Sequence, residues 1–208
     1  MKVFAIANPK GGSGKSTFST QLAGAFAAAG APVMLGDIDR QQSSREWLML
    51  RPPEVAPIAS WEIADPEAPA KPPKGTTHVV LDTPAGLSGK PLSKVLKVAT
   101  HVIVPVQPSL FDILATRHFL ESVQEEKALR KGNIQLGVVG MRVDPRTRAA
   151  GELERFLAGY ELPVLTYIRD TQLYVQLAAR GMTIFDLPTG RMERDREEWQ
   201  PVLDWAAA

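Results

Sequence analysis

The sequence contains no cysteine among its 208 residues. This absence excludes a disulfide framework and an iron–sulfur cluster held by cysteine thiolates of this chain. No apolar stretch approaches the ~18–20 residues that a membrane-spanning helix requires. The amino terminus enters an apolar run directly, without the charged region and cleavage pattern of a signal peptide. These absences predict a cytoplasmic protein with no membrane partner.

The chain also has no marked excess of charge of either sign. Lysine and arginine total 24, and aspartate and glutamate total 23, which gives a formal net charge of +1. A strongly basic composition is the usual sign of a nucleic-acid binder, so any basic surface here must be created by folding. The length and the hydrophobic content of 44% suffice for one well-cored domain, and we expect a single domain over residues 1–208.

A glycine-rich segment follows the first apolar run. It consists of Lys10, Gly11, Gly12, Ser13, Gly14, Lys15, Ser16 and Thr17. Its glycines allow successive backbone N–H groups to converge on anionic oxygens, and the helix expected after it directs its positive dipole end to the same point. In such a P-loop Lys15 reaches the β- and γ-phosphates, Ser16 offers its hydroxyl to Mg²⁺, and Thr17 bonds an α-phosphate oxygen. A turn with incidental lysines would not explain eight consecutive fitting positions.

Apolar runs alternate with segments of helical periodicity along most of the chain. The expected strands cover residues 2–7, 32–37, 79–82, 102–106, 134–139 and 164–167, and the expected helices cover residues 16–29, 92–99, 112–129 and 147–157. Strands that are apolar on both faces are typical of a buried parallel sheet. We therefore predict an α/β protein with the three-layer P-loop NTPase fold, in which a mostly parallel, twisted sheet carries helices on both faces.

Carboxylates end two of the expected strands. Asp37 and Asp39 follow one strand, and Asp82 ends the strand that begins at Val79. Ligands of parallel sheets bind at the carboxyl ends of the strands, where the P-loop also lies. We expect Ser16, Asp39 and Asp82 to surround Mg²⁺. A role in a turn or a helix cap is the alternative for Asp39.

The P-loop is a variant, because Pro9 occupies the position where the general pattern has glycine and Lys10 follows it. This variant resembles that of the ParA/MinD family of ATPases. The resemblance implies ATP or ADP with Mg²⁺ as the ligand. It also implies that Lys10 reaches across a dimer to the nucleotide of the other subunit, and that Lys10, Lys15 and Asp39 act in catalysis, Asp39 by orienting the attacking water. Arg40 stands where the family commonly has proline, so a restraint on φ is missing from this loop.

The resemblance extends over nearly the whole chain. Residues 83–86 resemble switch II, residues 104–109 resemble a Pro-Val-x-Pro-Ser turn, and residues 168–185 resemble the terminal signature of the family. Ser109 and Asp112 are available to cap the helix that follows the turn. In relatives this turn and the segment after the next strand flank the adenine, which implies base contacts for Pro108, Met141 and Arg142. A proline-shaped loop start is the alternative for the turn.

Two further segments are predicted to be peripheral. Prolines concentrate between residues 51 and 75, which predicts a surface excursion with a strand-like island at residues 58–63, and a disordered linker is the alternative. The carboxyl-terminal residues 191–208 mix acids and bases and lack a basic face opposite a broad apolar one, as a lipid-binding helix would need. We expect Trp199, Val202, Leu203 and Trp205 to cover the core instead.

The resemblance favours a small ParA-type, ParF-like plasmid partition ATPase without an amino-terminal helix-turn-helix domain. It implies an ATP-dependent homodimer that binds double-stranded DNA nonspecifically and hydrolyses ATP slowly until a ParB-like DNA-binding adaptor stimulates it. Such a protein drives partition of plasmid or chromosomal DNA and associates with the nucleoid. The candidates for contacts with the DNA backbone are Arg142, Arg146, Arg148, Arg169 and Arg180.

Two other functions remain open on the sequence. One is a MinD-like or other ParA-like positioner whose cargo is not DNA. The other is a metabolic P-loop enzyme similar to dethiobiotin synthetase, which shares the fold and parts of the phosphate loop. The carboxylates near Gln41 and the terminal signature favour the partition branch, but they do not identify the cargo.

Overall fold

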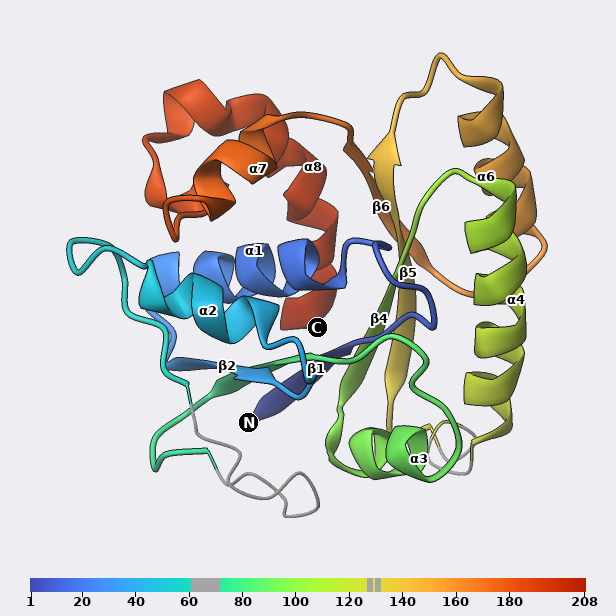
Figure 1. Cartoon of the computed structure of the whole chain (residues 1–208), viewed down its shortest axis with the longest axis horizontal. Coiled ribbons are helices and arrows are strands. Elements are labelled where there is room, and N and C mark those ends of the chain that lie inside the picture. The colour runs from blue at the N-terminus through green and yellow to red at the C-terminus, as the bar shows by residue number, and fades with distance from the viewer. Residues whose placement is uncertain (61–71, 127–128, 130–131) are drawn as a thin grey trace.

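The protein forms one six-stranded sheet in which every pairing is parallel (Figure 1). The computed structural model describes residues 1–60, 72–126, 129 and 132–208. The strand order is β2-β3-β1-β4-β5-β6. The strands are β1 (Lys2–Ile6), β2 (Val33–Asp37), β3 (His78–Asp82), β4 (His101–Val106), β5 (Gln135–Val143) and β6 (Val164–Arg169). The predicted parallel sheet is confirmed.

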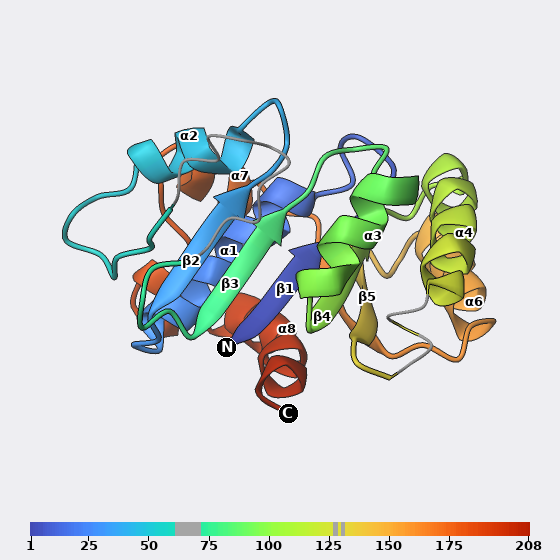
Figure 2. The same cartoon turned by 90° about the horizontal axis from the view of Figure 1, so that it is seen from below.

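Helices cover both faces of the sheet (Figure 2). Those of one face are α1 (Lys15–Ala28), α2 (Ser43–Met49), α7 (Leu173–Ala178) and α8 (Thr189–Ala207), and the 3₁₀ turn η1 (Ile184–Asp186) lies between α7 and α8 in the chain. Those of the other face are α3 (Gly89–Val98), α4 (Leu110–Glu125) and α6 (Arg148–Ala158). Each face has its own apolar core, one centred on Phe18 and Trp199 and the other on Leu96 and Leu120. The predicted three-layer arrangement is confirmed.

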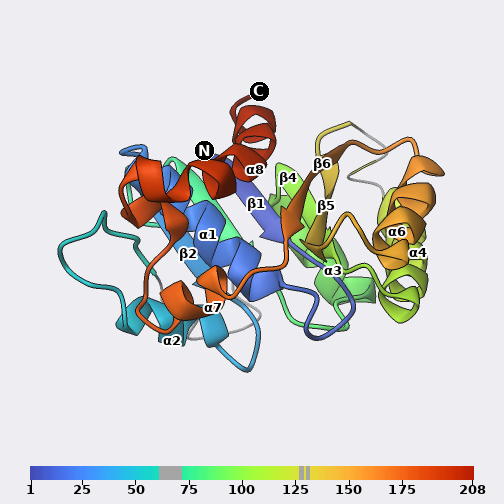
Figure 3. The same ribbon diagram turned by 90° about the horizontal axis from the view of Figure 1, so that it is seen from above.

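Helix α1 is buried on nearly all sides, because α2, η1 and α8 cover the face that points away from the sheet (Figure 3). Its Gly24 lies so close to Thr183 that a Cβ atom would come within 2.4 Å of that side chain. The P-loop therefore leads into a helix that packs in the interior of the fold rather than on its surface.

The helices expected from the sequence leave out α2, α7 and α8, and several boundaries differ. Helix α2 is short and follows two glutamines, so its helical periodicity is too brief to recognise. The helix expected at residues 112–129 ends at Glu125, and residues 127–128 and 130–131 lie outside the described residues. Of the island at residues 58–63, Ala59 forms a parallel bridge with Met34, and residues 61–63 lie outside the described residues.

The carboxyl-terminal segment forms a 19-residue helix, α8, although it contains Pro201. Trp199, Val202 and Ala206 are buried in the core, and Leu203 and Trp205 pack against it. The predicted role of this segment in covering the core is confirmed. Within the part of the chain that the structure describes, no helix is long and apolar enough to cross a membrane. The prediction of a single domain remains a prediction.

Candidate functional site

The P-loop lies at the carboxyl end of β1, near the centre of the sheet (Figure 3). Its backbone requires glycine at two positions, because Gly12 has φ +78° and Gly14, the residue before α1, has φ +96°. At Gly14 the space is also restricted, since a Cβ atom would lie 3.1 Å from Cε of Met141. The conformation of the loop thus allows an anion to approach its backbone N–H groups closely, as an anion-binding loop requires.

Lys15 is buried beneath the loop that it belongs to. Its Nζ donates a hydrogen bond of 2.8 Å to the carbonyl oxygen of Lys10. Burial lowers the pKa of Lys15, while the nearby carboxylates of Asp82 and Asp39 act in the opposite direction. Lys15, Asp82 and Asp39 are therefore close enough to interact electrostatically. A phosphate oxygen here would meet a poorly solvated cation.

Asp82 is 1% exposed and is only partly satisfied by hydrogen bonds. Ser44 donates its hydroxyl hydrogen bond to Oδ2, whereas Oδ1 has no partner within the described residues. Burial raises the pKa of Asp82 to about 6, and hydrogen bonds from Ser44 and Ser16 and the charge of Lys15 oppose this rise. Oδ1 of Asp82 thus lacks a hydrogen-bond partner among the described residues and lies near a serine hydroxyl. Carboxylate and hydroxyl oxygens are ligands that suit a hard divalent cation.

The ion would need ligands in addition to these side chains. Within the described residues no group of three or more histidine, cysteine, aspartate or glutamate side chains could hold a metal. Ser16 and Asp82 would therefore bind a cation together with phosphate oxygens and water, which is the usual mode for Mg²⁺. The predicted magnesium site of Ser16, Asp39 and Asp82 remains a prediction.

Asp37 and Asp39 have different environments. Asp37 is buried and accepts hydrogen bonds from the backbone N–H groups of Asp39, Ser44 and Arg45, at 3.0, 2.8 and 3.2 Å. Burial raises the pKa of Asp37, and these bonds oppose the rise. Asp37 thus anchors the start of α2. Asp39 is less buried, and its Oδ1 accepts a bond from the backbone N–H of Gln41 at 3.0 Å, which leaves carboxylate lone pairs for a water molecule.

Lys10 pairs with a carboxylate of its own chain. Its Nζ lies 3.2 Å from Oδ2 of Asp112 and 5.9 Å from the centre of the Phe111 ring. The Lys10 side chain is 39% exposed. Ser109 is the N-cap residue of α4, with its hydroxyl oxygen accepting a bond from the backbone N–H of Asp112, so the predicted cap is confirmed. The first turn of α4 therefore holds the variant lysine of the P-loop.

Polar contacts made by Asn8, Gln107 and Gly86, which the sequence analysis missed, fix the P-loop backbone. Asn8 is fully buried, donates to the carbonyl oxygen of Pro105 at 2.8 Å and accepts from the backbone N–H of Lys10 at 2.8 Å. Gln107 donates to the carbonyl oxygen of Gly12, and the N–H of Gly86 donates to the carbonyl oxygen of Pro9. The only sequence signal for Asn8 is a polar side chain at the end of an apolar strand. Ser44, the partner of Asp82, lies in the unrecognised helix α2.

The residues predicted to flank adenine occupy neighbouring strand ends but have different exposures. Pro108 is half-buried between β4 and α4. Met141 is buried on β5, where it packs against Gly14, while Arg142 is exposed in a bulge with φ +54°. Base contacts by these three residues remain a prediction.

The candidate DNA-binding arginines fall into two groups. Arg146 pairs with Asp144 and Arg169 pairs with Asp195, each at 2.8 Å, so carboxylates neutralise part of their charge. The other three, Arg142, Arg148 and Arg180, are exposed.

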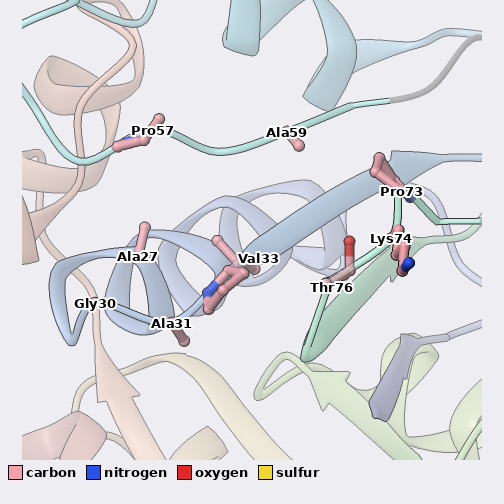
Figure 4. Close-up of a pocket in the computed structure, with 11 residues that line it drawn as sticks. Ala27, Gly30, Ala31, Val33, Pro57, Ala59, Pro73, Lys74 and Thr76 are labelled. Carbon is pink, nitrogen blue, oxygen red and sulfur yellow. The ribbon is translucent and has the colours of Figure 1, made fainter.

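A mainly apolar pocket lies at the other end of β2, away from the P-loop (Figure 4). It is lined by Ala27, Gly30, Ala31, Pro32, Val33, Pro57, Ala59, Pro73, Lys74, Gly75 and Thr76. Lys74 is the single ionisable side chain among these residues. The pocket therefore lacks the acid, base and anion-binding groups that the P-loop edge brings together.

Comparison with known proteins gives consistent matches over most of the chain. The family described as CobQ/CobB/MinD/ParA nucleotide binding domain matches residues 4–184. Two relatives named "Maintenance of carboxysome distribution protein A" come from Halothiobacillus neapolitanus (27% identical over 88% of this chain and 86% of the relative) and Gloeobacter kilaueensis (29%, 94% and 89%). The chromosome-partitioning ATPase Soj of Thermus thermophilus is 29% identical over 75% of each chain.

Solved structures show the same fold. Apo McdA of Cyanthece has a TM-score of 0.72 at 16% identity, covering 98% of this chain and 99% of that one. A putative plasmid partition protein of Borrelia burgdorferi, bound to AMPPNP, has a TM-score of 0.69 at 18% identity and 98% coverage of both chains. Cobyrinic acid a,c-diamide synthase of Mycobacterium smegmatis, with ADP and magnesium, has a TM-score of 0.67 at 23% identity, covering 95% of this chain and 97% of that one.

Proposed function

Because the chain belongs to the CobQ/CobB/MinD/ParA nucleotide-binding family, we propose that it is a positioning ATPase whose Mg²⁺-dependent ATP binding and hydrolysis switch it between dimer and monomer. The family assignment and the P-loop fold support the ATPase class. The ATP-type and ADP ligands of its structural neighbours support ATP, ADP and Mg²⁺ as its ligands. The observation that carries the proposal is the buried pair of Lys15 and Asp82 beneath the variant P-loop.

The residues at this edge of the sheet suit phosphoryl transfer to water. The glycine-rich backbone and Lys15 would hold the β- and γ-phosphates, and Ser16 with Asp82 would hold Mg²⁺, which neutralises phosphate charge when bound. Asp39 has free carboxylate lone pairs to accept a hydrogen bond from the attacking water and so orient it. Lys10 would add a positive charge to the nucleotide of the second subunit.

Two cargoes are compatible with this chemistry. Partition of plasmid or chromosomal DNA, through nonspecific DNA binding and a ParB-like adaptor, is supported by the similarity to Soj and to the plasmid partition protein of Borrelia burgdorferi. A cargo other than DNA, such as a protein-based compartment, is supported by the two relatives named for carboxysome distribution and by the similarity to McdA. In both cases we propose a nucleoid-associated dimer that a partner protein stimulates.

ATP hydrolysis with and without nonspecific duplex DNA tests the proposal, together with light scattering in a slowly hydrolysed ATP analogue and in ADP. We expect slow turnover, a dimer with the ATP analogue, a monomer with ADP and an effect of DNA on turnover. Lys10→Ala should bind nucleotide and lose partner-stimulated hydrolysis. A mass that does not depend on nucleotide, together with no response to DNA, would instead indicate a metabolic enzyme of this fold.

A further inference from the structure

Ser44 contacts the carboxylates that end two neighbouring strands. Asp37 ends β2 and Asp82 ends β3, and these two residues are partners in the parallel pairing of the strands. The backbone N–H of Ser44 donates a hydrogen bond of 2.8 Å to Oδ2 of Asp37, and its hydroxyl donates to Oδ2 of Asp82. Ser44 is fully buried. One residue therefore holds both carboxylates at the edge of the sheet where the P-loop lies.

Helix α2 keeps Ser44 in this position. The helix lies beside β2 (Figure 1). Trp47, three residues after Ser44 and therefore on the same side of the helix, is buried in the core that also contains Phe18 and Trp199. Cζ of Arg51 lies 5.4 Å from the centre of the Trp47 ring. The position of the Ser44 hydroxyl is thus supported by the packing of α2 against the core.

The two carboxylate oxygens of Asp82 differ in their contacts. Oδ2 accepts the hydrogen bond from Ser44, whereas Oδ1 is buried without a partner in the described part of the chain. A carboxylate that is held at one oxygen rotates less freely about its Cβ–Cγ bond, so the direction of its other oxygen is restricted as well. A buried polar atom without a partner indicates a ligand that the site receives. Oδ1 is therefore the oxygen of Asp82 that is available to a divalent cation.

We propose that Ser44 is a positioning residue for the magnesium site, an inference that rests on the proposed function. Its hydroxyl holds Oδ2 of Asp82 and so directs Oδ1 to the cation that accompanies the nucleotide. Hydrogen bonds to ligating carboxylates orient them, and the loss of such a bond typically lowers metal affinity by about 10–100-fold.

The same residue joins the two ends of the loop that carries Asp39. Asp37 accepts the backbone N–H of Ser44 at one oxygen and that of Asp39 at the other, at 2.8 and 3.0 Å. The proposed magnesium ligand, Asp82, and the carboxylate proposed to orient the attacking water, Asp39, therefore depend on the position of one serine.

The test compares Ser44→Ala with a matched control, Ser43→Ala. Ser43 precedes Ser44 in α2 and is exposed. The affinity for ADP is measured by isothermal titration calorimetry with Mg²⁺ and with EDTA, and the ratio of the two dissociation constants gives the gain from the cation. Ser44→Ala should reduce this gain by about 10-fold and should retain the affinity in EDTA to within about twofold, because it leaves the P-loop backbone and Lys15 unchanged. Ser43→Ala should match the wild type under both conditions.

A double variant separates the positioning of Asp82 from a general structural role. In the Asp82→Asn background, Ser44→Ala should not reduce the gain from Mg²⁺ any further, because the carboxylate that Ser44 orients is already absent. A further loss of the same size in that background would overturn the inference, and so would an unchanged gain in the Ser44→Ala single variant. Equal losses of affinity with Mg²⁺ and with EDTA would also overturn it, since they would show that Ser44 only supports the fold. A wild type that bound no ADP under either condition would instead contradict the proposed function on which the inference rests.

Discussion

The ammonium group of Lys10 lies 3.2 Å from Oδ2 of Asp112, in the first turn of the helix that Ser109 caps. The P-loop lysine that the proposed dimer requires is therefore bound within its own chain. If Lys10 reaches a second subunit, this ion pair must break first. The Lys10 side chain is 39% exposed and that of Asp112 is 10% exposed, so solvent screens the pair only in part, and we expect its loss to cost about 1 kcal/mol.

Asp112→Asn should therefore strengthen dimer formation in the presence of an ATP analogue. The substitution removes the charge that retains Lys10, and it leaves the backbone N–H that Ser109 caps. We expect the dimerisation constant to rise by about two- to fivefold, which corresponds to less than about 1 kcal/mol. Light scattering over a concentration series measures it. Glu121→Gln, on the exposed side of the same helix, is the control, and weaker dimerisation of Asp112→Asn would contradict the prediction.

Asp82 should make the nucleotide-free protein less stable as the pH rises. Its pKa is about 6 in the folded protein and 3.8 as the ordinary value, so the native state binds more protons between these two values. The free energy of unfolding therefore falls as the pH rises from about 4 to about 6, by up to about 3 kcal/mol. Asp82→Asn should remove this fall and be more stable than the wild type at pH 7, while losing Mg²⁺-dependent nucleotide affinity. Urea denaturation at several pH values measures the effect.

A control for this experiment is Asp170→Asn, because the Asp170 side chain is exposed. Its stability should follow the wild type at every pH. An Asp82→Asn variant that is less stable than the wild type at pH 7 would show that the charged carboxylate is already compensated in the absence of nucleotide.

Gly181→Ala should destabilise the protein strongly. Gly181 has φ +64°, and a Cβ atom would lie 2.4 Å from the backbone nitrogen of Arg51. Because backbone atoms cannot move aside easily, we expect a loss of about 3 kcal/mol or more in the free energy of unfolding. Gly190→Ala is the matched control, since Gly190 lies in the first turn of α8 and a Cβ atom added there would meet no atom within 4 Å beyond its chain neighbours and the backbone of its own helix. The control should be neutral or stabilising by up to about 1 kcal/mol. Equal denaturation midpoints for the two variants would contradict the prediction.

Two arginine–aspartate pairs of equal length should differ in their effect on stability. Arg51 and Asp186 are 5% and 1% exposed and 2.8 Å apart, and Arg51 also donates to the carbonyl oxygens of Ala56 and Gly181. Arg51→Leu leaves a buried carboxylate and should cost about 3–5 kcal/mol. Arg146→Leu breaks a pair of the same length whose arginine is 87% exposed, and its thermal unfolding should be indistinguishable from the wild type. Similar losses for both variants would show that burial is not the deciding factor.

The P-loop region shows which parts of the site can be predicted from sequence. Lys10 to Thr17 are contiguous in the sequence. The backbone conformations open to glycine and the chemistry of lysine and serine are local properties, so this segment can be recognised from the sequence alone. Asp82 is predictable because it ends an apolar strand. Ser44, Asn8 and Asp112 are not predictable in this way, because each acquires its role from a partner distant in sequence: Asp82 at 38 residues, Pro105 at 97 and Lys10 at 102.

Helix α8 shows a comparable limit for the fold. Its mixed charges and Pro201 give a weak helical pattern, yet the residues from Thr189 to Ala207 form a helix because Trp199, Val202 and Ala206 fill the core beside α1. Tertiary packing outweighs the local cost of proline here.

The sequence by itself determined the alternation of strands and helices, the parallel sheet, the phosphate loop and the family, because these follow from hydrophobic periodicity and from contiguous residues. Only the tertiary structure decided which carboxylate has an unpartnered oxygen, which one accepts backbone hydrogen bonds at the start of α2, and what holds Lys10. These properties depend on burial and on contacts between distant segments. Burial changes the free energy of a charge by amounts that no local pattern encodes.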